Sequence, residues 1–107
     1  MPEQAPRENA NKRYVSVILC YPEGKDRSHA QIIRFRFRDG SVWQVNSTRR
    51  GYWAAAQKAG GRGMLYPIVA APMLFEYGGV PGREREFKLF NDDDEWFVEV
   101  EEPEEEG

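Results

Sequence analysis

The feature that most constrains this chain is a strict alternation of apolar and arginine residues that ends in Asp-Gly. Residues 32–40 read Ile-Ile-Arg-Phe-Arg-Phe-Arg-Asp-Gly. Successive side chains of a β-strand point to opposite faces, so this run predicts a strand over residues 30–37 with one apolar and one basic face. An Asp-Gly pair after such a run is a strong signal for a β-hairpin. We therefore expect the chain to return as a second strand from Ser41 onward.

The register of this hairpin follows from keeping the apolar side chains on one face. A two-residue loop would place Phe35 opposite Gln44 and mix the two faces. A three-residue loop, with Gly40 in a left-handed bulge, places Phe35 opposite Trp43 instead. We predict this second register. It turns Ile33, Phe35 and Trp43 inward, and it turns Arg34 and Arg36 toward solvent.

Further segments carry strand patterns separated by turn residues. Residues 13–21 are largely apolar at both sets of alternate positions, which predicts a strand covered on both faces, with Cys20 buried. Pro67 cannot donate a backbone hydrogen bond, so its strand is expected to lie at an edge or to bulge there. The remaining strands are expected over residues 64–70, 73–77, 83–90 and 96–101, with turns at 78–82 and 91–94.

One segment predicts a helix. Residues 52–59 contain four alanines with Gln57 and Lys58, which favour a helix of about two turns, and Gly60 suits its C-terminal end. About six short strands and one short helix predict an all-β, mainly antiparallel fold, as an SH3-like or similar small barrel. The alternative is an open antiparallel sheet covered by the helix, an α+β arrangement.

The charge is divided unevenly along the chain. Residues 89–107 hold ten acidic residues and no Lys or Arg, whereas residues 1–88 hold all 15 basic residues against eight acidic ones. The formal charge is therefore −10 for the last stretch and +7 for the rest. We expect a disordered arm over residues 1–12, a single β-rich domain over 13–100 and an acidic disordered tail over 101–107.

Composition excludes several classes of protein. One cysteine permits no internal disulfide, and one cysteine with one histidine cannot build an ordinary structural zinc site. No apolar run reaches the roughly 18–20 residues that a membrane helix needs, and the polar N-terminal residues lack the apolar stretch of a secretory signal. These features favour a cytoplasmic location.

Three motifs together resemble a known family. They are the Asp-Gly hairpin at residues 37–40, the sequence Lys-Ala-Gly-Gly-Arg-Gly-Met-Leu-Tyr at 58–66, and Leu-Phe at 89–90 followed by Trp-Phe-Val-Glu at 96–99. The chain resembles a family of short bacterial proteins of unknown function over roughly residues 32–99, and it departs from them between 70 and 85. The resemblance implies one compact domain that ends near Glu99. It implies no activity and no catalytic residues.

Other chemistry-bearing residues have plainer structural explanations. His29 and Ser28 are neighbours on an extended chain and point apart, so they form no catalytic dyad by themselves. The four acidic residues 92–95 lack the spacing of a calcium loop. The glycine-rich residues 60–63 can form an anion nest, but glycines that join a helix to a strand are the better explanation. We expect no enzyme, no bound metal and no cofactor.

The basic face of the 30–37 strand points most directly to a function. Arginine side chains match phosphate oxygens in pairs, and small barrels hold single strands with a basic groove and exposed aromatic rings. We expect weak, sequence-tolerant nucleic-acid binding, with the acidic tail competing for the same surface. The expected binding residues are Arg34, Arg36, Arg49, Arg50, Lys58, Arg62 and Trp53.

The alternative is a protein-interaction adapter or a homodimer. The hairpin over residues 73–87 is unusually apolar for an extension, and exposed apolar hairpins pair with other chains. The expected interface residues are Met73, Leu74, Phe75, Tyr77 and Val80.

Overall fold

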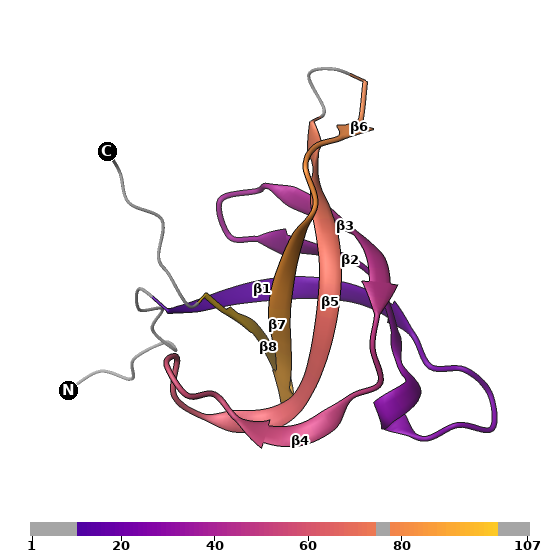
Figure 1. The fold of residues 1–107 in the computed structure, drawn as a ribbon, viewed down its shortest axis with the longest axis vertical. Helices are drawn as coiled ribbons and strands as arrows, with labels where there is room; N and C mark the ends of the chain where they lie inside the picture. The colour runs from indigo at the N-terminus through magenta and orange to yellow at the C-terminus, as the bar shows by residue number, and fades with distance from the viewer. Residues whose placement is uncertain (1–10, 75–77, 101–107) are drawn as a thin grey trace.

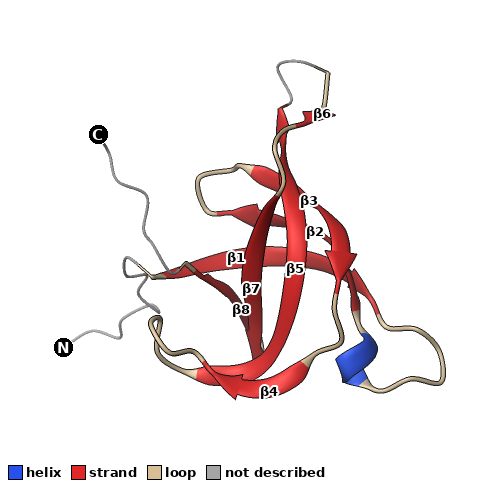
Figure 2. Ribbon diagram, in the orientation of Figure 1, coloured by secondary structure: helices blue, strands red, loops and turns tan. Residues whose placement is uncertain are grey.

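The chain forms an antiparallel barrel in the computed structural model, which describes residues 11–74 and 78–100 (Figure 1). The strands are β1 (Lys12–Cys20), β2 (Gln31–Phe37), β3 (Val42–Thr48), β4 (Tyr52–Ala55), β5 (Arg62–Leu74), β6 (Val80–Pro81), β7 (Arg85–Asp92) and β8 (Glu95–Glu99). A single-turn 3-10 helix, η1 (Arg27–His29), lies between β1 and β2 (Figure 2).

Six of these strands close the barrel. β1 pairs with β2, β2 with β3, β3 with β5, β5 with β7, β7 with β8, and β8 with β1, all antiparallel. Each barrel strand therefore lies beside the next one in sequence, which is the connectivity of an up-and-down barrel. The predicted small barrel is confirmed, and the open sheet is not what the chain forms.

The predicted helix over residues 52–59 is wrong. Tyr52–Ala55 is strand β4, which pairs with the first residues of β5, and residues 57–59 form a turn. Alanine favours helices only weakly, and tertiary packing overrides that preference here. Ala56 and Ala59 are buried against Leu65, Phe90 and Phe97 on the outside of the barrel. The only helical turn within residues 11–74 and 78–100 is η1.

The two prolines of β5 are placed where they cost few hydrogen bonds. β4 pairs with residues 62–65 of β5 and β3 pairs with residues 68–72, so Pro67 lies where one neighbour replaces the other. Its carbonyl accepts a hydrogen bond from the amide of Arg49 at 2.9 Å. β5 continues through Pro72 to Leu74, so the break predicted between a strand over residues 64–70 and one over 73–77 does not occur at Pro72.

The barrel interior is the main core. Its buried side chains come from β2, β5, β7 and β8, including Phe35, Ile68, Leu89 and Val98, and partly buried side chains of β1 and β3 pack against them. Trp43 is half-buried on this core, with its ring 4.9 Å from that of Phe87, as the hairpin register predicts. Burial of such a side chain contributes about 1.5–3 kcal/mol, so these residues supply most of the stability of the fold.

Two predictions of buried side chains are wrong, one for Ile33 and one for the outer face of β1. Ile33 was expected inside, but it is 47% exposed and Ile32 is buried instead. Leu19 pairs with Ile32 while Ile18 pairs with Arg34, so Ile33 is the extra residue of a β-bulge, and the strand changes face there. β1 was expected to be covered on both faces, but Ser16, Ile18 and Cys20 on its outer side are exposed.

Candidate functional site

The turn between β2 and β3 decides which arginines face solvent. Gly40 has a φ of +97°, and its amide donates to the carbonyl of Phe37 at 3.0 Å. The carboxylate of Asp39 accepts from the amide and the hydroxyl of Ser41 at 2.8 and 2.7 Å. The predicted three-residue loop is confirmed by the pairs that follow it, which are Arg34 with Gln44, Phe35 with Trp43 and Arg36 with Val42.

A basic strip follows from this register on the outside of β1 and β2. Arg36 lies opposite Ser16 and Arg34 opposite Ile18, and all four side chains are exposed. Farther along, the Arg38 guanidinium carbon and the Lys12 Nζ each lie 5.3 Å from the centre of the Tyr14 ring. We define the basic strip as Lys12, Tyr14, Arg34, Arg36 and Arg38.

The surface of the strip is hollowed beside the hairpin. A shallow groove of about 530 Å³ is lined by Tyr14, Ser16, Arg36 and Arg38, with Gly40 at its end. A groove of this shape with two guanidinium groups can hold an extended anionic chain.

The arginines of β2 are not neutralised by neighbouring carboxylates. Among the described residues, no carboxylate lies within ion-pair distance of Arg34 or Arg36. Glu84 accepts a hydrogen bond from the side-chain amide of Asn46 at 2.6 Å. The strip therefore presents positive charge to solvent.

The other basic residues expected from the sequence lie elsewhere. Arg49 and Arg50 follow β3, and Arg50 Nε donates to the Ser28 hydroxyl at 3.1 Å. Lys58 lies in the turn between β4 and β5, and Arg62 is the first residue of β5. This turn approaches the strip: a Cβ on Gly61 would lie 3.6 Å from Lys12 Nζ. Arg34 and Arg36 are thus grouped with Arg38 and Lys12, apart from Arg49 and Arg50.

The predicted aromatic residue, Trp53, is on a different surface. It is 64% exposed on β4, and the pairing places it on the same face of the β4–β5 hairpin as Arg62. Tyr52 points the opposite way. The aromatic residue that does lie in the strip, Tyr14, was missed, as was Lys12. Their alternation in β1 becomes informative only once the pairing of β1 with β2 is known.

The glycine-rich loop binds an anion from within the chain. Gly60 and Gly61 have φ values of +85° and +93°, so the loop needs both glycines. The amides of Lys58 and Ala59 donate to Glu99 Oε2 at 2.6 and 2.8 Å. The last residue of β8 is therefore held by the two amides that directly precede the glycine-rich residues 60–63.

The Asp26, Ser28 and His29 side chains form a cap and not a catalytic triad. Asp26 Oδ1 accepts from the Ser28 hydroxyl at 2.5 Å, from the Ser28 amide at 3.0 Å, and lies 3.3 Å from His29 Nδ1. These hydrogen bonds, those of Ser28 first, lower the pKa of the exposed Asp26 carboxyl. The Ser28 hydroxyl donates to the Asp26 carboxylate, so these three side chains do not show the contact between serine and histidine that defines a triad.

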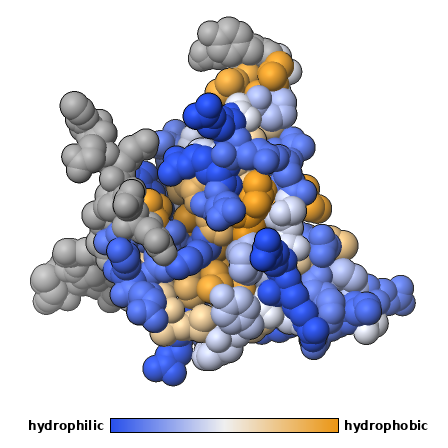
Figure 3. Space-filling model, viewed as in Figure 1, coloured by the Kyte–Doolittle hydropathy of each residue, from blue (hydrophilic) through white to orange (hydrophobic). Residues whose placement is uncertain are grey.

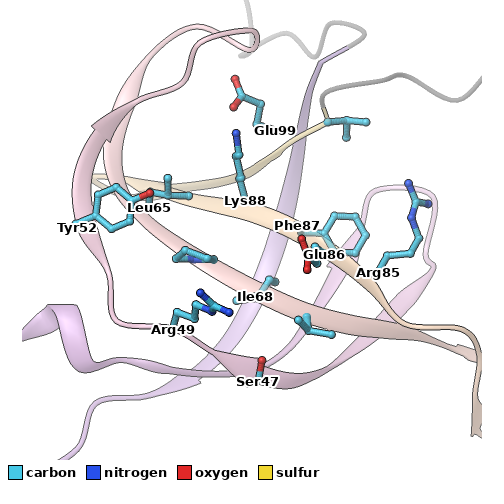
Figure 4. A pocket seen from close by; sticks show the side chains of 13 residues that line it. Ser47, Arg49, Tyr52, Leu65, Ile68, Arg85, Glu86, Phe87, Lys88 and Glu99 are labelled. Atoms are coloured by element: carbon cyan, nitrogen blue, oxygen red, sulfur yellow. The ribbon is translucent and has the colours of Figure 1, made fainter.

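A second, larger groove lies on the outside of β5 and β7 (Figure 4). It has a volume of about 630 Å³, a floor that includes Leu65, Pro67 and Val69, and the Tyr52 ring at one side. Charges of both signs surround it, with Arg49 and Lys88 facing Glu86 and Glu99. Its mixed charge makes it a weaker site for a polyanion than the basic strip.

The hairpin beyond the barrel exposes apolar side chains. Leu74 pairs with Val80, and they are 40% and 53% exposed. Figure 3 shows hydrophobic surface at this tip, beside β6. Met73 is half-buried. Phe75 and Tyr77, which the sequence also places in this interface, lie outside the described residues.

Neither a metal site nor a membrane helix is found in the part of the chain that the structure describes. No group of three His, Cys, Asp or Glu side chains within residues 11–74 and 78–100 could hold a metal ion. No helix in the same residues is long and apolar enough to span a bilayer. The family resemblance stays a prediction, because no family model, no curated protein and no solved structure matches this chain.

Proposed function

We propose that the chain binds single-stranded nucleic acid weakly and without sequence preference through the basic strip. The observation that carries the proposal is the row of exposed arginines at alternate positions of β2, with no described carboxylate neutralising Arg34 or Arg36. Guanidinium groups form paired hydrogen bonds with phosphate oxygens, and contacts of this kind supply affinity without reading bases.

The spacing of the strip favours a single strand. Alternate residues of an antiparallel strand lie about 6.8 Å apart, so three arginines in a row can follow successive phosphates of an extended chain. The strip has no helix or ribbon that could enter a major groove. Recognition is therefore limited to the backbone, which is sequence-tolerant.

The test is fluorescence anisotropy with a labelled oligothymidylate at low salt. The variant R34Q/R36Q is expected to bind about tenfold more weakly, which corresponds to about 1.4 kcal/mol. The matched control R49Q/R50Q removes the same charge from another surface and is expected to retain most of the affinity. Four phosphate contacts predict a slope of log K against log salt of about −3 for the wild type.

Two results would contradict the proposal. Equal losses in the two double variants would show that net charge alone acts, without a defined strip. Binding that does not change with salt would exclude phosphate contacts as its source.

The exposed pair Leu74 and Val80 favours a second candidate, association of two copies through the projecting hairpin. Sedimentation velocity tests it. Val80→Glu is expected to convert a dimer to a monomer, whereas Ile18→Glu, a matched change on the barrel wall, leaves the dimer intact. A wild-type chain that is monomeric at all concentrations excludes this candidate.

A further inference from the structure

We propose that the acidic segment 101–107 folds back onto the basic strip of the same chain and contacts Lys12 and Arg38. This inference goes beyond the proposed function, because it depends on the charge and shape of the strip and not on what else binds there. It assigns an occupant to the groove lined by Tyr14, Ser16, Arg36 and Arg38.

The point at which the described chain ends supports this assignment. Val100, the last described residue, forms two hydrogen bonds with Asn11. Its amide donates to the Asn11 carbonyl at 2.9 Å, and its carbonyl accepts from Asn11 Nδ2 at 2.6 Å. Asn11 directly precedes Lys12 in the sequence. The acidic segment therefore starts beside one end of the strip.

The reach of the segment limits which cations it can contact. Seven residues span at most about 25 Å, and β8 runs antiparallel to β1, so the segment must reverse before it can run along the strip. Pro103 suits such a reversal, because proline favours the second position of a turn. Along β1, Tyr14 lies about 10 Å from Asn11 and Ile18 about 23 Å. Arg38, over Tyr14, is within reach, whereas Arg34, opposite Ile18, is not.

The charges are complementary. Residues 101–107 contain five glutamates, and the near end of the strip contributes Lys12 and Arg38. The larger groove on β5 and β7 sets the carboxylates Glu86 and Glu99 among its cations, whereas no carboxylate lines the groove of the strip. Attraction between oppositely charged groups held on one chain is not diluted, since tethering keeps the local concentration of the segment high.

The experiment compares amide spectra of two full-length proteins without nucleic acid. One is the wild type, and the other carries Gln in place of Glu101, Glu102, Glu104, Glu105 and Glu106. We expect shift differences at Lys12, Tyr14 and Arg38, little change at Arg34, and none at Arg49 or Tyr52. The differences should not depend on protein concentration. They should shrink as salt rises to about 0.15 M, where the screening length falls to about 8 Å.

A second pair of variants checks the contact itself. In an Arg38→Gln background the glutamine substitutions should no longer shift Tyr14, whereas in an Arg50→Gln background the shift should persist. Differences centred on Arg49, Tyr52 and Lys88 would place the segment in the larger groove and overturn the proposal. An absence of any difference at low salt would overturn it as well. Neither outcome bears on whether the strip binds nucleic acid, which the anisotropy measurement decides.

Discussion

At the scale of single residues, backbone geometry and hydrogen bonds explain positions that the sequence alone presents as chemical candidates. Gly63 of the glycine-rich loop is an example. A Cβ at this position would lie 2.2 Å from the Asn91 carbonyl oxygen, so β5 and β7 can approach only because the side chain is absent. The glycines that resemble a ligand loop are therefore needed to build the barrel.

Gly63→Ala is expected to destabilise the protein by about 2–3 kcal/mol, because the new Cβ would clash with backbone atoms of β7, which cannot move aside as a side chain can. Urea denaturation measures the change. Gly24→Ala is the control: its φ is +79°, but nothing lies near its Cβ, so a smaller cost of about 1 kcal/mol is expected. Equal losses would show that the approach of β7 is not the cause.

The hydroxyl of Ser41 is expected to keep the pKa of the Asp39 carboxyl low. Hydrogen bonds from the Ser41 amide and hydroxyl lower the pKa of Asp39 below 3.8. Because this pKa is depressed in the folded state, the stabilisation is present above 3.8 and is lost as the pH falls through the folded-state value. Ser41→Ala removes one bond and should raise the pKa part of the way. A carbon-13 titration of the Asp39 carboxyl measures it, and Ser16→Ala should leave it unchanged.

At the scale of elements, the alternation of apolar and polar residues predicted the hairpin correctly. The features that depend on strands distant in sequence could not be predicted in this way. The hairpin register was predictable because Phe35 and Trp43 must share the buried face. The bulge at Ile33 was not, since either of two adjacent isoleucines satisfies the pattern. The segment 52–59 is a strand and a turn because β5 offers hydrogen bonds and a buried surface that no local preference reveals.

Glu99 is expected to hold the turn between β4 and β5. Glu99→Ala leaves the amides of Lys58 and Ala59 without their acceptor, and bonds to a charged group contribute about 1.5–3 kcal/mol. Stability should fall by a similar amount, and hydrogen exchange at these two amides should accelerate. Glu86→Ala, an exposed change on β7, serves as the control and should do neither.

At the scale of the whole molecule, the division of charge was evident from the sequence, but the grouping of the cations was not. Arg34 and Arg36 could be assigned to one face from their alternation alone. Arg38 continues the same alternation, whereas Lys12 joins them only through the pairing of β1 with β2. Arg49 and Arg50 follow β3 and lie apart from this strip.

Removal of residues 101–107 is expected to strengthen binding of the oligothymidylate severalfold at low salt, because five negative charges no longer compete for the strip. Anisotropy titrations of the full and shortened chains compare the two affinities. The difference should vanish as salt screens the segment. Equal affinities at low salt would contradict competition.

The pairing of β1 with β8 also bears on how the protein is made. Each barrel strand can pair with the strand before it as soon as both have left the ribosome. β1, however, gains its second partner only when residues 97–99 of β8 have been made. Until then the sheet of the nascent chain has two edge strands with unpaired backbone groups, which are β1 and the strand made last. This connectivity therefore leaves the growing chain open to pairing with other chains until β8 is complete.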